Sequence, residues 1–225
     1  MIRNRCYWWL LPLFFCLLTA CGDDDYHYPD VKLEFLTAQA GAEGSLQSIL
    51  TDEGKTYAVV EDATNTHIDA NSSIRIVSNY GPTATPDGTS GMKLYAAMRT
   101  VSPMPQPAAS FKDGVKTDPA DILSIWMGLD YLNIVVNVKA QGGKHTFHFI
   151  EDEVAMDAAT GNKEVFLTLY HDAPGDIGYT QRAYLSVPLR QYVEEGVRKV
   201  TVHFSLHTQS GEVKTYNLDY IPLFK

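Results

Sequence analysis

Residues 200–207 read Val-Thr-Val-His-Phe-Ser-Leu-His, a strict alternation of apolar and polar side chains. Successive side chains of a β-strand point to opposite faces, so this stretch predicts a strand with one face in a core and the other in water. The same split recurs at residues 132–138 and 146–149. A slip of one residue would expose four large side chains of residues 200–207, so we expect the pairing of this strand to be well defined.

Alternation of this kind continues along the chain and predicts an all-β protein of two modules. Five short strands in the first half suggest a small barrel, and they are expected at 31–36, 45–50, 56–60, 73–79 and 92–99. Seven strands in the second half fit a two-sheet sandwich, and they are expected at 122–127, 131–138, 145–150, 164–170, 182–187, 199–206 and 214–220. Helical turns are expected only near 188–196.

Residues 101–110 separate the two sets of strands and carry three prolines. Proline fixes φ and cannot donate a ladder hydrogen bond, so this stretch predicts a linker. The predicted domains are a barrel over residues 30–100 and a sandwich over residues 111–225.

The first twenty residues have the order of a secretory signal peptide. Arg3 and Arg5 precede an apolar run that is too short for a transmembrane helix, and the run ends in Leu18-Thr19-Ala20-Cys21. Small residues before a Cys form a lipobox, so we expect cleavage between Ala20 and Cys21 and lipid attachment at Cys21. The alternatives are an ordinary secretory signal with a chance Cys, or an uncleaved anchor.

Cysteine use agrees with a lipid anchor. The chain has three cysteines, of which Cys6 and Cys16 lie in the expected signal peptide and Cys21 would carry the lipid. No free thiol would then remain for disulfides, nucleophilic catalysis or metal binding. Several acyl chains on one residue would hold the protein at the outer membrane, since each buried CH₂ contributes about 0.8 kcal/mol.

An acidic tether is expected over residues 21–29, where Gly22 is followed by three aspartates. It resembles the acidic tract that follows the lipidated Cys in Bacteroidota lipoproteins, where such a run can direct a protein to the cell surface. A solvated, flexible tether fits the same residues, so the cell surface and the periplasmic face both stay open.

The charge balance argues against nucleic acid as a partner. The formal net charge is −9, and loss of Arg3 and Arg5 with the signal peptide changes it to −11. A protein this acidic repels phosphate backbones and anionic lipid head groups.

Short motifs follow one another along the chain in a characteristic order. After the lipobox and the acidic tract come Leu-Thr-Asp-Glu-Gly at 50–54, Asp-Pro-Ala-Asp-Ile at 118–122, Trp-Met-Gly-Leu-Asp-Tyr-Leu-Asn at 126–133 and Leu-Thr-Leu-Tyr-His-Asp-Ala-Pro-Gly-Asp at 167–176. In order and spacing they resemble the NigD-like lipoproteins of Bacteroidota over nearly the whole chain.

The resemblance implies an N-terminal OB-like barrel and a C-terminal, Ig-like β-sandwich. The family is named after a gene in a bacteriocin operon, and its biochemical role is not established. The lipidated Cys21 is therefore the only functional residue that the resemblance carries over.

Histidines offer no predicted metal site. His145 and His148 are three apart on an expected strand and should point to opposite faces. His203 and His207 share a face, but four strand residues span about 13 Å, whereas zinc needs nitrogen ligands at about 2 Å.

Two groups of carboxylates are candidate sites. Asp172 and Asp176 follow His171 in a Pro-Gly turn, which is the most site-like cluster, but no calcium-binding loop spacing surrounds them and turns favour Asp for backbone reasons. Glu151-Asp152-Glu153 is expected in a loop, where adjacent carboxylates generally serve solvation rather than glycoside chemistry.

Three aromatic residues are candidates for stacking against a ligand or for packing in the core. Tyr80 and Tyr95 could stack on a ligand of an OB-like barrel, and residues 31–120 hold 7 basic and 10 acidic residues, which leaves glycan or protein as the partner. Trp126, the only Trp after residue 20, lies among apolar residues and is expected in the sandwich core.

No nucleophile elbow, phosphate loop or dinucleotide fingerprint is present, so no catalytic residue and no cofactor are predicted. We expect a membrane-anchored, non-enzymatic binding or accessory module for a protein or glycan partner. The alternatives are a carbohydrate hydrolase that uses Asp172 or Glu151, and a bacteriocin-associated immunity or resistance protein.

Overall fold

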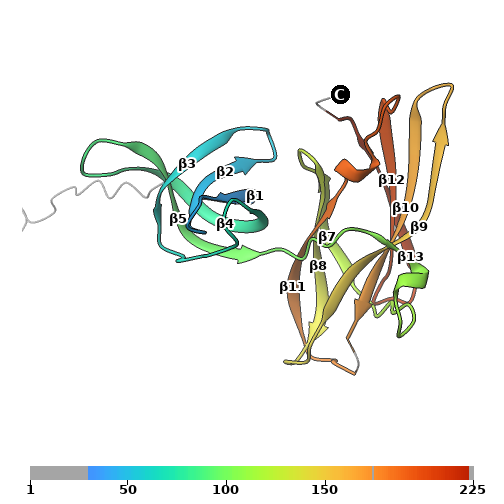
Figure 1. Ribbon diagram of the computed structural model, residues 1–225. Coiled ribbons are helices and arrows are strands. Elements are labelled where there is room, and N and C mark those ends of the chain that lie inside the picture. Colours follow the sequence, from blue (N-terminus) through green and yellow to red (C-terminus); the bar gives the residue numbers. More distant parts are fainter. Residues whose placement is uncertain (1–29, 174, 223–225) are drawn as a thin grey trace, which may run out of the picture. The chain divides into compact units, whose positions relative to one another are not determined.

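A computed structural model describes residues 30–173 and 175–222 of the chain (Figure 1). The expected cleavage site between Ala20 and Cys21, the expected lipid attachment at Cys21 and the expected acidic tether lie outside these residues. The barrel and the sandwich belong to one unit by their internal contacts, and this unit begins at Val31.

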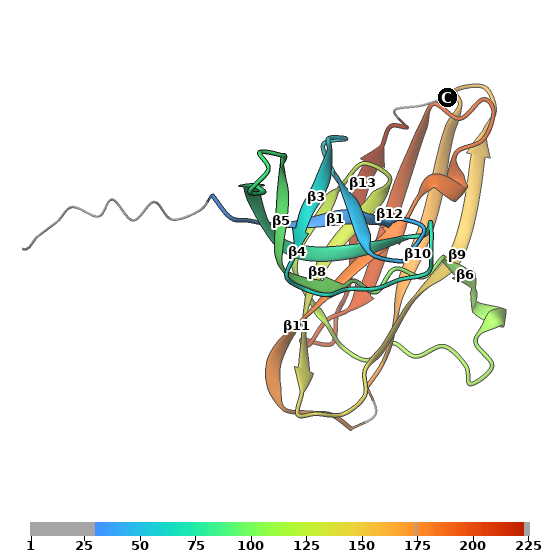
Figure 2. The same cartoon turned by 60° about the vertical axis from the view of Figure 1, so that its left-hand side comes forward.

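The first five strands close into a barrel in the order β1-β2-β3-β5-β4 (Figure 2). Neighbouring strands are antiparallel, except for β3 and β5, which are parallel. The barrel strands are β1 (Lys32–Ala40), β2 (Leu46–Thr51), β3 (Thr56–Asp62), β4 (Ser73–Ala84) and β5 (Ser90–Arg99). The predicted five-stranded barrel is confirmed.

Alternate apolar residues of these strands fill the barrel. Leu36 of β1 pairs with Ile76 of β4, and both side chains are fully buried, together with Ala38, Leu46, Ile49, Tyr80 and Leu94. Closure also requires the absence of a side chain at Gly91. A Cβ there would lie 2.9 Å from the carbonyl oxygen of Ala58, so β5 can approach β3 this closely only with glycine.

Two sheets face each other in the second module. The larger has the order β13-β12-β10-β9-β6 and the smaller β11-β8-β7. The strands are β6 (Gln106–Pro107), β7 (Asp121–Met127), β8 (Tyr131–Ala140), β9 (Thr146–Asp157), β10 (Asn162–Asp172), β11 (Tyr179–Pro188), β12 (Lys199–His207) and β13 (Val213–Tyr220). The seven long strands lie where the alternation predicts them, which confirms the sandwich.

Strand β12 has the two faces that its sequence predicts. Val200, Val202, Phe204 and Leu206 are at most 1% exposed and belong to the core between the sheets. The polar residues between them face outward, where Ser205 bonds to Thr215 of β13. Apolar burial of this kind is the main source of stability in a sandwich.

Part of the proline-rich stretch belongs to the sandwich. Gln106–Pro107 forms β6, which pairs in parallel with Ile150 and Glu151 at the edge of the larger sheet, and Ala108–Ser110 forms the 3₁₀ turn η2. An edge strand tolerates proline because its outward side needs no N–H donor. A second 3₁₀ turn, η3 (Arg190–Tyr192), lies within the predicted helical stretch 188–196.

Among the residues that the structure describes, no helix is long and apolar enough to cross a membrane.

Candidate functional site

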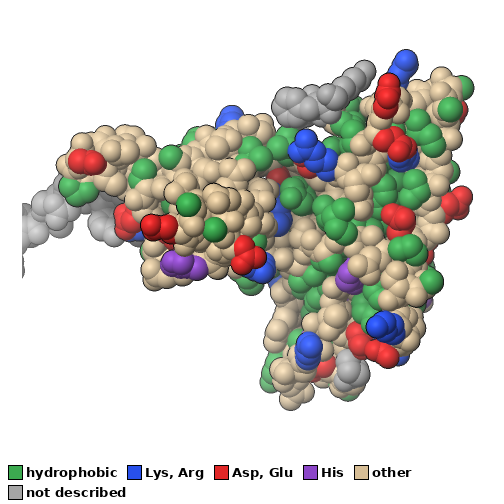
Figure 3. Space-filling model, in the orientation of Figure 1, with side chains coloured by type: hydrophobic (Ala, Val, Ile, Leu, Met, Phe, Trp, Pro, Cys, Tyr) green, Lys and Arg blue, Asp and Glu red, His purple; other side chains and the backbone are tan. Residues whose placement is uncertain are grey.

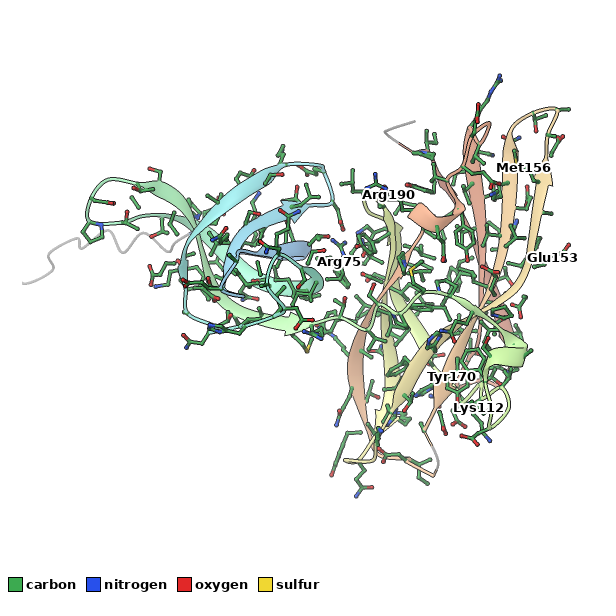
Figure 4. The ribbon with its side chains drawn as sticks, in the orientation of Figure 1. Arg75, Lys112, Glu153, Met156, Tyr170 and Arg190 are labelled. Carbon is green, nitrogen blue, oxygen red and sulfur yellow. The ribbon has the colours of Figure 1, made fainter. Side chains whose placement is uncertain are left out.

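A buried arginine connects the barrel to the three-stranded sheet. The side chain of Arg75, on β4, is 2% exposed and donates hydrogen bonds to Asp52 of the barrel at 2.5 Å and to Asn133 of β8 at 3.0 Å (Figure 4). Asn133 donates in turn to the second oxygen of Asp52 at 2.7 Å, and Ser186 of β11 donates to Asn133 at 2.7 Å. A buried charge is tolerated only when it is paired and hydrogen-bonded in this way.

Arg75, Asp52, Asn133 and Ser186 form the joint between the barrel and the sandwich, and two further contacts complete it. The guanidinium carbon of Arg75 lies 4.4 Å from the centre of the Tyr131 ring, within cation–π distance. Gly128 packs so closely that a Cβ there would lie 2.5 Å from the carboxyl carbon of Asp52 and 2.6 Å from the amide nitrogen of Asn133. Any larger residue at Gly128 would therefore push these partners apart.

The position of Asn133 corrects the sequence-based prediction. Alternation placed Asn133 on the wet face of its strand, but its exposure is 0%. The reason is that the barrel covers this face of β8, so residues that would face water in an isolated sandwich form a second, smaller interior.

Aromatic residues form a wall beside the polar joint. Phe35 of β1 contacts Trp126 of β7 edge to face at 5.2 Å between ring centres, and its ring centre lies 6.0 Å from that of Tyr184 of β11. Val77 and Val135 complete this cluster. The prediction that Trp126 lies in the sandwich core is wrong, because Ile125 and Met127 take the core-facing positions and Trp126 points to the opposite face.

An open cleft of about 510 Å³ lies along this wall. Its lining combines apolar residues of both modules with a few charged side chains, namely Leu33, Glu34, Phe35, Thr51, Asp52, Glu53, Val77, Leu123, Ser124, Trp126, Met127, Val135, Arg182 and Tyr184. Leu33 and Leu123 are 61% and 49% exposed, which is unusual for leucine and marks a surface that a partner can cover. In Figure 3 the acidic and basic side chains are scattered over the visible face, so no large surface of one charge is seen there.

The carboxylates of the cleft already have partners. Glu34 accepts a hydrogen bond from the hydroxyl of Tyr80 at 2.7 Å, and Glu53 pairs with Lys55 at 2.7 Å. Burial and the bond to Glu34 both raise the pKa of Tyr80, so its hydroxyl stays a donor at neutral pH. By contrast, Arg182 and the indole N–H of Trp126 have no hydrogen-bond partner within the described part of the chain.

The two tyrosines that the sequence suggested as a stacking platform do not lie together. Tyr80 is 2% exposed in the barrel core, whereas Tyr95 is on the surface beside Lys93, whose ammonium lies 5.3 Å from the ring centre. They cannot hold one ligand between them.

The predicted Asp172–Asp176 turn holds a chain of hydrogen bonds. His171 Nδ1 lies 2.9 Å from the carbonyl oxygen of Asp118, and its Nε2 lies 2.9 Å from His145 Nδ1. His145 Nε2 is 3.1 Å from Asp176, which also accepts N–H bonds from Gln141 and Gly143. Since a carbonyl only accepts, His171 must donate from Nδ1 and accept at Nε2, so His145 donates to it from Nδ1.

This arrangement lowers the pKa of two side chains, His171 and Asp176. Burial lowers the pKa of His171 below its usual 6.5, because the charged imidazolium is poorly solvated there. The pKa of Asp176 is also lowered from 3.8, since the bonds from His145, Gln141 and Gly143 outweigh the opposing effect of desolvation. The cluster therefore holds loops together, and the oxygens of Asp176 accept hydrogen bonds from N–H groups.

The carboxylates considered for hydrolysis are far apart. Glu151 lies within β9 rather than in the predicted loop, and it accepts a hydrogen bond from Tyr192 at 2.6 Å. Asp172 pairs with Thr146 while Glu151 pairs with Leu167, five residues along β10, which corresponds to about 16 Å. Glycosidase carboxylates are separated by roughly 5 to 10 Å.

The remaining histidines also lie apart. His148 bonds to backbone atoms of Phe149, and His203 stacks on Phe166 and pairs with Glu164. Within residues 30–173 and 175–222, no three His, Cys, Asp or Glu side chains are grouped so as to hold a metal ion.

A barrel and a sandwich with an aromatic-lined cleft beside their joint define a two-domain, all-β protein with a candidate binding cleft. The NigD-like C-terminal beta sandwich domain matches residues 102–220. A NigD-like immunity protein from Bacteroides caccae ATCC 43185 is 36% identical, with a TM-score of 0.71, and the match covers 88% of this chain and 100% of that chain. The chain belongs to the NigD-like family.

Two other solved structures share the fold. A protein of unknown function from Bacteroides vulgatus ATCC 8482 is 20% identical, with a TM-score of 0.63, and covers 86% of this chain and 92% of its own. A protein from Bacteroides fragilis NCTC 9343 described as a "putative lipoprotein" is 11% identical, with a TM-score of 0.59. The match covers 87% of this chain and 100% of that chain. No curated protein matches the chain.

Replacing Asp52 should destabilise the protein strongly. We expect Asp52→Ala to lower the free energy of unfolding by about 3–5 kcal/mol, because it leaves the guanidinium of Arg75 buried without its counter-charge. Glu53→Ala, in the adjacent exposed pair with Lys55, should change it by less than about 0.5 kcal/mol. Chemical denaturation measures both, and equal effects would contradict a role for Asp52 in the joint.

Stability should fall on acidification. In the unfolded chain His171 takes up a proton near its usual pKa of 6.5, whereas in the folded protein its pKa is lower. The contribution of His171 to the free energy of unfolding is therefore complete above pH 6.5 and is lost as the pH falls below it. Asp176 adds a further loss as the pH drops through its lowered folded pKa. Unfolding free energies measured between about pH 7.5 and 5 should show a flatter slope for His171→Gln but not for the exposed control His67→Gln. Parallel slopes for all three proteins would disprove this assignment.

Proposed function

We propose that the protein is an exported lipoprotein, tethered to the outer membrane through lipid on Cys21, that binds a protein or glycan partner in the cleft without catalysing a reaction. The observation that carries the binding role is the cleft beside the joint. It combines solvent-exposed leucines, an aromatic wall and side chains without partners, which is the composition of binding pockets.

The membrane location rests on the sequence. A basic start, a short apolar run and the lipobox at Ala20 and Cys21 precede the folded unit, and acidic residues follow as a tether. The description of a B. fragilis protein of the same fold as a "putative lipoprotein" agrees with this location. A folded module joined to a membrane anchor by an acidic tether suits the capture of a partner near the membrane.

A non-enzymatic role is supported by the side chains that could otherwise do chemistry. Glu151 and Asp172 are too far apart to act on one bond, and Asp176 is held by three N–H groups. The polar residues beside the cleft, Asp52 and Arg75, neutralise each other in the joint. None of these groups is free to transfer a proton to a ligand in the cleft.

An immunity role is the second candidate, and one observation favours it. The 36% identical relative from B. caccae is described as a NigD-like immunity protein. Capture of a bacteriocin in the cleft would be the corresponding activity here. Deleting the gene and challenging the cells with bacteriocins tests this role, and unchanged sensitivity would remove it.

Mutating Cys21 should release the protein from the membrane. Mass spectrometry of the mature amino terminus should show acyl chains. In cell fractionation, Cys21→Ala should move from the membrane into the soluble fraction, because the lipid provides the anchor. Cys6→Ala, in the expected signal peptide, is the matched control and should stay membrane-bound. An unacylated mature terminus would contradict the proposal.

Mutating the cleft should weaken ligand binding. Residues 22–225, which include the whole folded unit, can be screened against displayed peptides and a glycan array. Ligands should bind Leu123→Asp at least about tenfold more weakly, since a charge would enter the apolar lining. Val213→Asp, on β13 outside the cleft lining and 58% exposed against 49% for Leu123, should bind as well as the parent. Turnover of any ligand, lost in Asp172→Asn, would instead show an enzyme.

A further inference from the structure

We propose that the cleft holds an extended segment of a partner protein in which an apolar side chain lies beside a carboxylate. The apolar side chain packs against the aromatic wall, and the carboxylate pairs with Arg182. This inference rests on the proposed function, because it names the ligand of the same cleft.

The apolar half of the ligand follows from the lining. Phe35 lies against both Trp126 and Tyr184, and the three rings form one wall. Leu33 on the barrel side and Leu123 on the sandwich side stand exposed around it. A volume of about 510 Å³ admits one or two side chains together with their backbone. Burying the two leucines would remove apolar surface from water, which is the main driving force of association.

Three carboxylates line the cleft, and each has a partner within the protein. The carboxylate of Asp52 takes bonds from Arg75 and Asn133. Glu34 is bonded to Tyr80, and Glu53 to Lys55. Arg75 and Lys55 balance the charges of Asp52 and Glu53, whereas the neutral Tyr80 leaves Glu34 charged, so a ligand carboxylate is expected beside Arg182 and away from Glu34.

Two donors of the lining have no partner within the protein. The indole nitrogen of Trp126 only donates, and the guanidinium of Arg182 carries five N–H donors. Neither has a partner among the residues described, and no buried side-chain nitrogen or oxygen there lacks one, so the indole N–H is open to solvent. A matching ligand supplies acceptors, such as a backbone carbonyl for Trp126 and a carboxylate for Arg182.

The apolar lining favours a polypeptide over a glycan. Leu33, Val77, Leu123 and Val135 offer aliphatic surface to a ligand, which the many hydroxyls of a sugar ring do not match. A polypeptide combines apolar side chains with carbonyl acceptors, and an Asp or Glu next to the anchor adds the charge that complements Arg182.

Trp126 allows a direct test, since it is the only Trp in residues 22–225 and lines the cleft. End-blocked hexapeptides Gly-Ser-Leu-Asp-Ser-Gly and Gly-Ser-Leu-Asn-Ser-Gly are titrated into the protein, and Trp fluorescence gives each Kd. The Asp peptide should bind about tenfold more tightly than the Asn peptide, the effect expected of a charge-assisted hydrogen bond. The preference should vanish in Arg182→Gln and persist in Arg190→Gln, whose arginine is exposed but lies outside the cleft lining.

Each other outcome has a distinct meaning. Equal Kd values for the two peptides, or a preference that survives in Arg182→Gln, would overturn the role of the carboxylate. A saturable response to maltohexaose without one to either peptide would overturn the polypeptide ligand while leaving the cleft as a binding site. No response to any probe, with no ligand sensitive to Leu123→Asp in the screens, would reject the binding function itself.

Discussion

The buried guanidinium of Arg75 sets the main constraint on the structure. A charge removed from water costs several kcal/mol unless partners surround it, and here those partners come from both modules. Asp52 is supplied by the turn after β2, while Asn133 and Ser186 are supplied by the three-stranded sheet. The barrel and the sandwich can satisfy these bonds in only one relative position, so the network fixes the joint and, with it, the two walls of the cleft.

The cleft depends on the joint through shared residues. Asp52 both pairs with Arg75 and lines the cleft, and Gly128 brings β7 close enough for Trp126 to contact Phe35. Directional polar bonds therefore hold the orientation, while the apolar residues beside them are left partly uncovered. A joint made only of apolar side chains would bury more surface but would specify the orientation less strictly.

Sequence periodicity predicted the strands well and their surroundings less well. Alternation indicates which side chains share a face, as Val202 and Phe204 do, but it does not indicate what covers that face. Asn133 was therefore predicted on the surface, and Trp126, between Ile125 and Met127, in the sandwich core. One signal was available: residues 134–136 are continuously apolar, and a strand that is apolar on both faces is covered on both. The bond between His145 and His171 had no such signal, because it joins residues 26 positions apart through loop geometry.

The positive charge of Arg182 in the cleft acts at short range and is opposite in sign to the net charge of the protein. The net charge of −9 repels an acidic partner at a distance, which slows its approach. Within about 8 Å, the Debye length at physiological salt, Arg75 and Lys55 balance the charges of Asp52 and Glu53, so Arg182 attracts a carboxylate that is placed beside it and away from Glu34. The local attraction can thus select a carboxylate only when it is brought in beside an apolar anchor that has already entered the cleft. Charge alone would not bring a ligand there, and the aromatic wall alone would not distinguish one apolar segment from another.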